Sequence, residues 1–312
     1  MKKLKVLLAM VLALAICLAF CACAKTTEQP QSDDISGEEN SAQPTALGDP
    51  EKKAILVVSF GTSYNETRAV TIEAIENAIT AEFTDFDVRR AFTSQIIIDK
   101  LASRDGLEID NVAQALERLI SEGYGTLVVQ PTHIMNGYEY DEMLENIEPY
   151  KDSFVNLAVG QPLLSSDDDY TAVAEMLAAE TAEYDADNSA VVFMGHGTEH
   201  VANSSYAQLQ QKLLDLGYDN YVIGTVEAAP SLEDVMEKCE ELGVSKVVLL
   251  PFMIVAGDHA NNDMAGDEEG SWKTEFKAAG YEVECVLRGV GEYEAAQKLF
   301  VEHTREAVES LG

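Results

Sequence analysis

Short apolar runs alternate with amphipathic segments along residues 51–312, and this alternation predicts strands separated by helices. Runs rich in apolar and β-branched residues predict strands at 54–60, 88–92, 125–130, 156–159, 191–194, 220–226, 246–250 and 282–287. Apolar residues at helical spacing predict helices at 67–82, 96–102, 111–122, 141–150, 170–181, 205–216, 231–242, 270–279 and 294–309. Strands separated by helices pair in parallel, so we predict an α/β fold with parallel sheets flanked by helices.

The two halves of this pattern resemble each other locally. Residues 55–62 align with 191–198, and residues 127–137 align with 247–257. The long separation between the aligned segments indicates a duplicated α/β unit and not a short solenoid repeat. We therefore predict two Rossmann-like lobes, an N-terminal lobe at 51–185 and a C-terminal lobe at 186–312. The strand ends of both lobes should face a cleft between them.

Residues 1–23 are expected to be a targeting segment outside the fold. Lysines at the start of the chain precede an apolar run at residues 6–22, as in secretory signal peptides. A small residue before Cys23 and a polar chain after it are typical of a bacterial lipoprotein cleavage site. Cys23 is the expected lipidation site, with Cys21 as the alternative, although the run is also long enough to remain as a membrane anchor. Either way, we expect an exported, membrane-tethered protein on the outer side of the cytoplasmic membrane or in the periplasm.

Residues 24–50 differ in composition from the rest of the chain. They are rich in Ser, Thr, Glu, Gln, Asp and Pro and contain few large apolar residues. Such a segment buries too little apolar surface to offset the entropy of ordering, so we expect a disordered acidic tether. In the folded part, Cys239 and Cys285 are too few for a disulfide framework. A single disulfide between them is an alternative, but we expect two separate buried thiols.

The chain is strongly acidic, with a formal net charge of −34. A nucleic-acid backbone is bound by clustered Lys and Arg, and the sequence contains no such cluster. Nucleic acid is therefore excluded as a partner. The acidic residues are expected mainly to keep an exported protein soluble.

A glycine-flanked histidine follows the central apolar run of the second half. His196 stands between Gly195 and Gly197, directly after the strand expected at 191–194. Ligands bind at the carboxyl ends of parallel strands, so His196 should be presented to a ligand. A single histidine at a strand end is also often structural, so this position alone does not decide its role.

Two further strand ends of the same half carry potential partners for His196. Glu227 follows the strand expected at 220–226, and His259 lies beyond the turn at Pro251. Two imidazoles and one carboxylate suit Co(II), Ni(II), Zn(II) or Fe(II) better than calcium or magnesium. Because the sequence has no His-x-x-x-His helix and no paired-cysteine motif, spacing alone leaves a metal site and structural histidines equally open.

No other segment carries a motif for nucleotide binding, phosphate binding or serine hydrolysis. The sequence has no Gly-x-Gly-x-x-Gly fingerprint and no phosphate-binding loop, and Gly-His-Gly is not the Gly-x-Ser-x-Gly elbow of hydrolases. The acidic run 167–169 is expected to begin a helix. Asp263 and the acidic stretch 267–269 are expected at a loop rim. His133 follows a strand of the first half, whereas His303 on the last helix is expected at the surface or in packing.

Several short motifs, taken together, resemble one enzyme family. They are Ser-Phe-Gly-Thr-Ser-Tyr at 59–64, Arg-Ala-Phe-Thr-Ser at 90–94, Pro-Leu-Leu-Ser-Ser at 162–166, Met-Gly-His-Gly at 194–197, Gly-Thr-Val-Glu at 224–227, Val-Ala-Gly-Asp-His-Ala at 255–260, Asn-Asp-Met at 262–264 and Ser-Trp-Lys at 271–273. In this order, the motifs resemble the sirohydrochlorin cobaltochelatases of the anaerobic cobalamin pathway, which are class II chelatases. The resemblance covers residues 54–308. It implies two Rossmann-like lobes with the active site in the cleft between them, insertion of Co(II) into a dianionic tetrapyrrole, and no nucleotide.

The resemblance also assigns roles to residues. It implies that His196, Glu227 and His259 bind the metal and that His196 accepts protons. Because metallation removes two pyrrole N–H protons, the chemistry itself makes Glu227 a second catalytic candidate, which neutralises part of the ion's charge and can accept a proton. The macrocycle would contact aromatic, hydroxyl and basic residues at the first lobe's strand ends. The candidates are Phe60, Thr62, Ser63, Arg90, Phe92 and Thr93. Turn formation or packing is an equally open role for each of these six.

The export signal leaves a second function open. A biosynthetic chelatase is expected beside its substrate in the cytoplasm, whereas this chain carries a signal for export. The alternative is an exported metal- or tetrapyrrole-binding or uptake protein that keeps the chelatase fold without turnover. The sequence leaves homo-oligomerisation and the choice of metal open as well.

Overall fold

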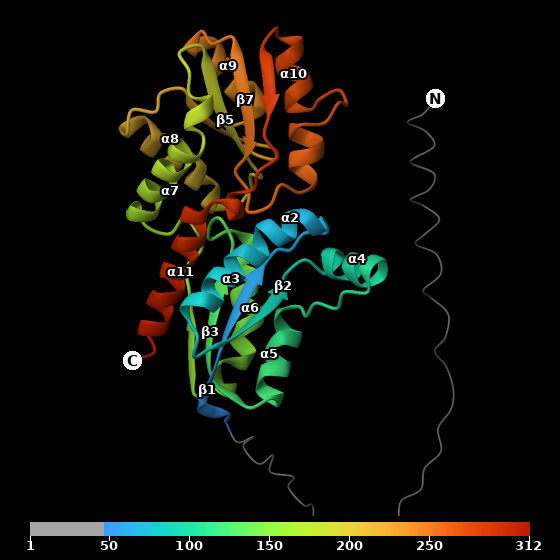
Figure 1. Ribbon diagram of the computed structural model, residues 1–312, viewed down its shortest axis with the longest axis vertical. Helices are drawn as coiled ribbons and strands as arrows, with labels where there is room; N and C mark the ends of the chain where they lie inside the picture. Colours follow the sequence, from blue (N-terminus) through green and yellow to red (C-terminus); the bar gives the residue numbers. More distant parts are fainter. Residues whose placement is uncertain (1–46) are drawn as a thin grey trace, which may run out of the picture. The chain divides into compact units, whose positions relative to one another are not determined.

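The computed structural model describes residues 47–312 (Figure 1). The predicted signal segment, Cys23 and nearly all of the predicted tether lie outside the described residues. Within residues 47–312, no helix combines the length and the apolar character needed to cross a membrane.

The described chain contains two four-stranded parallel sheets (Figure 1). The first is built from β1 (Asp49–Ser59), β2 (Asp87–Phe92), β3 (Tyr124–Pro131) and β4 (Asn156–Val159), in the order β2-β1-β3-β4. The second is built from β5 (Ser189–Gly195), β6 (Tyr221–Thr225), β7 (Lys246–Pro251) and β8 (Glu282–Cys285), in the order β6-β5-β7-β8. We call these sheets, with the helices that cover them, the first and second lobes. The predicted α/β class and parallel pairing are confirmed.

The two sheets have the same topology, as the internal repeat predicts. β1 and β5 contain the aligned segments 55–62 and 191–198 and occupy the same place in their sheets. β3 and β7, which begin the second aligned pair, also occupy equivalent places. Residues 54–58 and 190–194 are completely buried, because helices cover both faces of each sheet. Strand ends that are equivalent in sequence are therefore equivalent in space.

Ten α-helices connect the strands in the described part of the chain. They are α2 (Asn65–Val70), α3 (Ile72–Glu82), α4 (Gln95–Asp105), α5 (Val112–Ser121), α6 (Tyr138–Ile147), α7 (Asp167–Glu180), α8 (Ser204–Asp215), α9 (Leu232–Leu242), α10 (Trp272–Ala278) and α11 (Glu294–Glu309). Short 3-10 turns add η1 (Glu148–Ser153), η2 (Ala182–Tyr184), η3 (Val201–Asn203) and η5 (Val290–Glu292), and η4 (Ala260–Met264) is a π-helical turn.

The single helix predicted at 67–82 is divided in the structure. Thr71 leaves the helical conformation, with φ −116° and ψ −82°, and separates α2 from α3. Its hydroxyl donates to the carbonyl of Thr67 over 2.6 Å, and its side chain is completely buried. Hydroxyl-to-backbone bonds of this kind compete with the regular helix ladder, which explains the break.

Two helices, α7 and α11, each pack against the lobe opposite to the one that their position in the sequence predicts. The sequence predicts a change of lobe at 185–186, yet α7 packs against α8 of the second lobe. The last helix, α11, packs against α3 and β3 of the first lobe (Figure 1). One apolar cluster therefore contains residues of both sheets, such as Ile55 and Phe193, together with Phe300 of α11. The exchanged helices thus link the two lobes through a shared apolar cluster.

A buried hydrogen bond joins the two exchanged helices. Asp169 of α7 accepts a hydrogen bond at 3.0 Å from Nε2 of His303 of α11, and only 4 % of the His303 side chain is exposed. Asp169 also forms a capping box with Ser166, which agrees with the predicted helix start at 167–169. Donors from Ser165 and His303 lower the pKa of Asp169 against the opposing effect of burial. His303 thus has a packing role and is not a surface residue.

Both cysteines of the described chain are free thiols, as predicted. Cys239 is buried on α9, and burial raises its pKa to about 12. Cys285 at the end of β8 is half-buried. Neither thiol is poised for reactivity, because the thiolate is the reactive form.

Candidate metal centre and inter-lobe cleft

Three side chains from separate strand ends of the second lobe converge on one point. His196 follows β5, Glu227 follows β6, and His259 follows β7 and precedes η4. One ligand atom of each lies within 4.8 Å of the others. The imidazole rings of His196 and His259 meet edge to face, with their centroids 4.6 Å apart. The three residues chosen from the sequence as metal ligands are thus brought together.

Backbone hydrogen bonds bring His196 and Glu227 together. The amide of Val226 donates to the carbonyl of Gly195 over 3.0 Å, and the amide of Glu227 donates to the carbonyl of His196 over 2.9 Å. The parallel pairing of β5 with β6 therefore continues past the strand ends. The relative position of the two ligands is fixed by the sheet itself.

Gly197 makes this close approach sterically allowed. Its φ is +85°, in the region that side chains with a Cβ rarely adopt. A Cβ here would lie 2.8 Å from the amide nitrogen of Ala228 and 2.9 Å from the side chain of Thr225. The hydroxyl of Tyr206 also accepts a hydrogen bond from the Gly197 amide at 3.3 Å. The glycine predicted to turn the chain is thus required at this position.

Hydrogen bonds assign the tautomer of both histidines. His196 Nδ1 lies 2.9 Å from the carbonyl oxygen of Gly197, and His259 Nδ1 lies 2.8 Å from Oδ2 of Asp263. A carbonyl and a carboxylate only accept hydrogen bonds, so Nδ1 carries the proton in both rings. Nε2 then keeps its lone pair for a metal ion or a proton.

Asp263, which the sequence predicts at a loop rim, contacts one residue of the cluster. It follows His259 at the i+4 position and lies in the π-helical turn η4. A carboxylate hydrogen-bonded to a ligating histidine orients the ring and raises its basicity. The His-x-x-x-Asp spacing was the available signal, but it indicates a contact only if this loop is helical.

The geometry suits a transition-metal ion that is held loosely. Nitrogen and oxygen ligands lie about 2.0–2.2 Å from such an ion, so two ligands of one ion are at most about 4.4 Å apart. Ligand atoms within 4.8 Å of one another need only a small closing movement. The side chains of His196 and Glu227 are 50 % and 55 % exposed, so the ion could enter and leave from solvent.

The six proposed macrocycle contacts differ in accessibility. Phe60 is 49 % exposed, whereas Thr62, Ser63 and Phe92 are buried. The Phe92 ring packs directly against Gly61, so it supports the loop after β1. Among these four, only Phe60 presents a large accessible surface.

The other two candidates are engaged by carboxylates. Arg90 donates from Nε to Glu76 over 2.7 Å and also forms an ion pair with Glu73. These carboxylates raise the pKa of Arg90 against the opposing effect of burial. Thr93 donates from its hydroxyl to Glu139 over 2.8 Å. Arg90 and Thr93 thus hold elements of the first lobe together in this structure.

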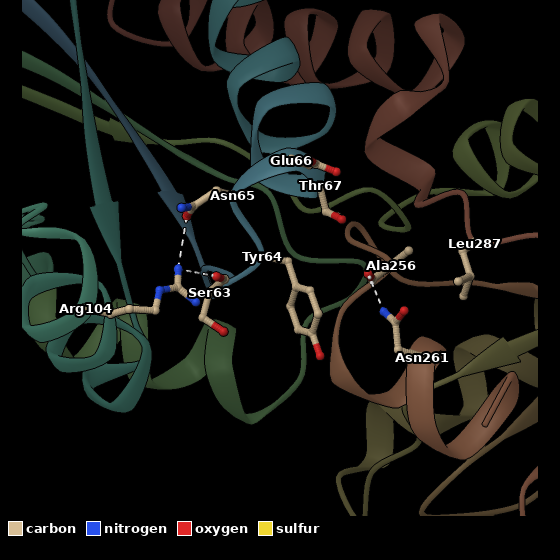
Figure 2. A pocket seen from close by; sticks show the side chains of 9 residues that line it. All are labelled: Ser63, Tyr64, Asn65, Glu66, Thr67, Arg104, Ala256, Asn261 and Leu287. Carbon is tan, nitrogen blue, oxygen red and sulfur yellow. Dashed lines mark hydrogen bonds between the residues drawn. The ribbon is translucent and has the colours of Figure 1, made fainter. Parts of the chain in front are cut away.

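The lobes meet at their strand ends, where a pocket of about 440 Å³ lies beside Tyr64 (Figure 2). Figure 2 shows Tyr64 between first-lobe residues such as Arg104 and second-lobe residues such as Asn261. The Tyr64 hydroxyl donates to Oδ1 of Asp258 across the lobes over 3.2 Å. Asp258 directly precedes His259, so this contact is adjacent to the candidate metal centre.

The remaining histidines after strand ends lie outside the three-residue cluster. Both ring nitrogens of His133 are buried without a hydrogen-bond partner in the described chain. Burial lowers the pKa of His133 to about 4, so the ring is neutral at pH 7. His200 instead crosses the cleft, with Nε2 3.3 Å from Oδ2 of Asp141 on α6.

Comparison with known proteins agrees with this geometry. Residues 53–309 match the family model described as cobalt chelatase (CbiK). The chain belongs to the cobalt chelatase family. It is 42 % identical over 257 residues to the sirohydrochlorin cobaltochelatase of Salmonella typhimurium, covering 82 % of this chain and 97 % of that protein. It is 35 % identical over 263 residues to the sirohydrochlorin cobaltochelatase CbiKC of Nitratidesulfovibrio vulgaris, covering 83 % of this chain and 92 % of that protein.

The fold of this cobalt chelatase family member also resembles a solved class II chelatase. The structure of SirB from Bacillus subtilis with Fe3+ aligns with a TM-score of 0.57 and 16 % identity. The alignment covers 83 % of this chain and 97 % of SirB. The expected class II chelatase architecture is therefore confirmed for the described chain.

Proposed function

We propose that this protein is a sirohydrochlorin cobaltochelatase, which inserts Co(II) into sirohydrochlorin with release of two protons. The observation that carries the proposal is the convergence of His196, Glu227 and His259, whose ligand atoms lie within 4.8 Å of one another. Membership of the cobalt chelatase family and the names of two relatives covered almost completely support this substrate pair. Cobalt is the metal substrate, and no nucleotide takes part.

The donor set suits an ion that must be transferred and not retained. Two neutral imidazoles and one carboxylate bind a divalent transition metal but leave coordination positions open. Macrocycle nitrogens can therefore approach the ion before the protein ligands leave it. The carboxylate of Glu227 compensates part of the ion's charge during this exchange.

Metallation also requires two pyrrole N–H protons to be removed. His196 is proposed as the acceptor, because its Nδ1–H donates to the carbonyl of Gly197 and its Nε2 is left with a lone pair. An imidazole titrates near neutral pH and serves well as a general base. The half-exposed Glu227 carboxylate, 3.7 Å from His196 Nδ1, is proposed to accept a proton as well.

The direct test is a chelatase assay on protein that lacks residues 1–23. Sirohydrochlorin in large excess is mixed with Co(II), Fe(II) or Ni(II) in parallel, and the free-base absorption is followed over time. Loss of many equivalents of free base per protein with Co(II) is expected. A change that stops at one equivalent would contradict turnover and instead support the metal- or tetrapyrrole-binding alternative.

We further propose that the protein is exported and tethered to the membrane through a lipid on Cys23. The support is the sequence of residues 1–23, which lie outside the described structure. The test is metabolic labelling with a radiolabelled fatty acid in a bacterial host, followed by fractionation. Label and membrane association should be lost in Cys23→Ala and kept in Cys21→Ala. The reverse pattern would assign the lipid to Cys21, and label in neither protein would contradict the proposal.

A further inference from the structure

Large apolar side chains are exposed at the carboxyl ends of four strands. Phe60 follows β1, Ile96 follows β2, Tyr138 follows β3 and Val201 follows β5. Their exposed fractions are 49 %, 80 %, 60 % and 84 %. Single exposed apolar residues need no explanation, but a group around one opening indicates a ligand-binding surface. All four are on the side of the sheets that carries the metal centre.

Hydrogen bonds link the segments that carry three of these side chains. The amide of Ser94 donates to the carbonyl of Phe60 over 3.2 Å, which joins the ends of β1 and β2. Thr93 donates to Glu139 over 2.8 Å, which joins the end of β2 to α6. Phe60, Ile96 and Tyr138 are thus carried by three loops in successive contact.

A further contact joins Tyr138 to the second lobe. The rings of Tyr138 and His200 meet edge to face, with centroids 4.9 Å apart. His200 is followed directly by Val201, and it belongs to the loop that begins with His196. Tyr138, like Asp141, therefore lies against the loop of the proposed proton acceptor.

The lobes also meet next to the proposed metal ligand His259. Tyr64 donates to Asp258 across the lobes over 3.2 Å, beside His259. Thr62 lies close to Gly257, since a Cβ added at Gly257 would be 4.0 Å from the Thr62 hydroxyl. Together with the contact between the rings of His196 and His259, these pairs bring first-lobe residues next to the candidate metal centre.

We propose that Tyr138, with Phe60 and Val201, forms the apolar surface against which the face of the macrocycle packs. The proposal rests on the proposed function, and it adds Tyr138 and Val201 as substrate-positioning residues. A flat, conjugated ring is recognised by aromatic and aliphatic side chains, whereas its pyrrole nitrogens need the histidines. Packing of the ring on Tyr138 would hold those nitrogens beside the loop of His196.

The position of Tyr138 suits it to the anchoring role. It is the first residue of α6, and its ring is already restrained by the contact with His200. A restrained aromatic side chain loses little conformational entropy when a ligand packs against it. Its 60 % exposure also means that truncation should leave the folded core intact.

Tyr138→Ala and Val201→Ser remove parts of the proposed surface, and Tyr138→Phe and Val155→Ala are their controls. Tyr138→Phe keeps the aromatic ring. Val155→Ala truncates a 44 % exposed apolar residue that directly precedes β4 and so lies at the amino ends of the strands, opposite the ends that carry the metal centre. The dissociation constant of metal-free sirohydrochlorin is measured by absorption titration, together with KM and kcat. Co(II) affinity is measured separately without tetrapyrrole.

Tyr138→Ala is expected to raise the sirohydrochlorin dissociation constant roughly fivefold, within the range found for aromatic contacts. KM should rise in parallel, whereas Co(II) affinity and the thermal unfolding midpoint stay unchanged. Tyr138→Phe and Val155→Ala should bind like wild type. Equal binding by Tyr138→Ala and Val155→Ala would overturn the proposal. If wild type binds sirohydrochlorin but does not insert Co(II), the proposed function is overturned. The sirohydrochlorin dissociation constants of Tyr138→Ala and the control variants would still test the role of Tyr138.

Discussion

Asp263 accepts a hydrogen bond from His259 over 2.8 Å, and this contact fixes the orientation of one proposed metal ligand. Removing a carboxylate that orients a ligating histidine typically costs 10–100-fold in metal affinity. Asp263→Ala is therefore expected to weaken Co(II) binding by roughly tenfold or more. The Co(II) absorption spectrum during titration measures the change.

Asp267→Ala is the matched control for Asp263→Ala. Asp267 is an exposed carboxylate of the same region, and it pairs with Lys273 over 2.7 Å. It should leave Co(II) affinity unchanged, although it removes the same charge. Equal losses in the two variants would show that general electrostatics, and not the orientation of His259, determines the affinity.

The three converging side chains should have separable roles. His196→Ala is expected to abolish turnover, because it removes both a ligand and the proposed proton acceptor. Glu227→Ala and His259→Ala are expected to weaken Co(II) capture, which a direct Co(II) titration measures alongside the chelatase assay. Glu199→Ala is the control, since Glu199 is an exposed carboxylate near His196 in sequence. Retained activity in all three variants would remove the site assignment.

Gly197 and Gly217 allow a matched test of the turn that carries His196. Both have positive φ, +85° and +88°, but a Cβ at Gly217 would meet no atom within 4 Å. Both substitutions to Ala should cost about 1–2 kcal/mol in backbone strain. Only Gly197→Ala adds a clash, with the amide of Ala228 at 2.8 Å, and displaces the carbonyl that orients His196.

The readouts for this pair are the free energy of unfolding and Co(II) affinity. Gly217→Ala should lower the free energy of unfolding and leave Co(II) binding unchanged. Gly197→Ala should lower the free energy of unfolding further and weaken Co(II) binding roughly tenfold or more. Equal Co(II) affinity in the two variants would show that the turn at Gly197 does not position His196.

The sequence predicts the strands and the metal cluster because both depend on local patterns. A buried parallel strand is a short apolar run, and its carboxyl end is the place where a ligand is expected. β4 (Asn156–Val159) and α11 (Glu294–Glu309) occur with the predicted bounds. His196 and Glu227 directly follow such runs, so parallel pairing brings them together. His259 lies further along the loop after β7, and the family resemblance, not the spacing, identified it as a ligand.

The sequence did not predict features that depend on packing between distant segments. The exchange of α7 and α11 between lobes needs knowledge of which apolar faces meet, and periodicity does not contain it. The burial of His303 follows from that exchange, because its partner Asp169 lies on α7. The ion pair between Arg90 and Glu76 was not predicted for the same reason. From the sequence, a basic residue at a strand end is equally compatible with a substrate contact.

His133 provides a prediction about stability against acid. Burial lowers its pKa from 6.5 to about 4, and its ring nitrogens have no hydrogen-bond partner among the described residues. Between these two values the unfolded chain binds a proton at this histidine, whereas the folded chain does not. The free energy of unfolding should therefore fall as the pH decreases from 6.5 towards 4, by about 3 kcal/mol over the whole window.

His133→Met is the appropriate variant, because the aligned position of the second lobe is Met253. Methionine does not titrate, so the free energy of unfolding should decrease less steeply with falling pH than in wild type. Denaturant unfolding at pH 8, 6.5, 5.5 and 4.5 measures this difference. Above pH 7.5 the two proteins should show parallel pH dependence, since His133 is neutral in both states there, and any constant offset reports packing alone. The same acid slope in wild type and His133→Met would mean that folding does not lower the pKa of His133.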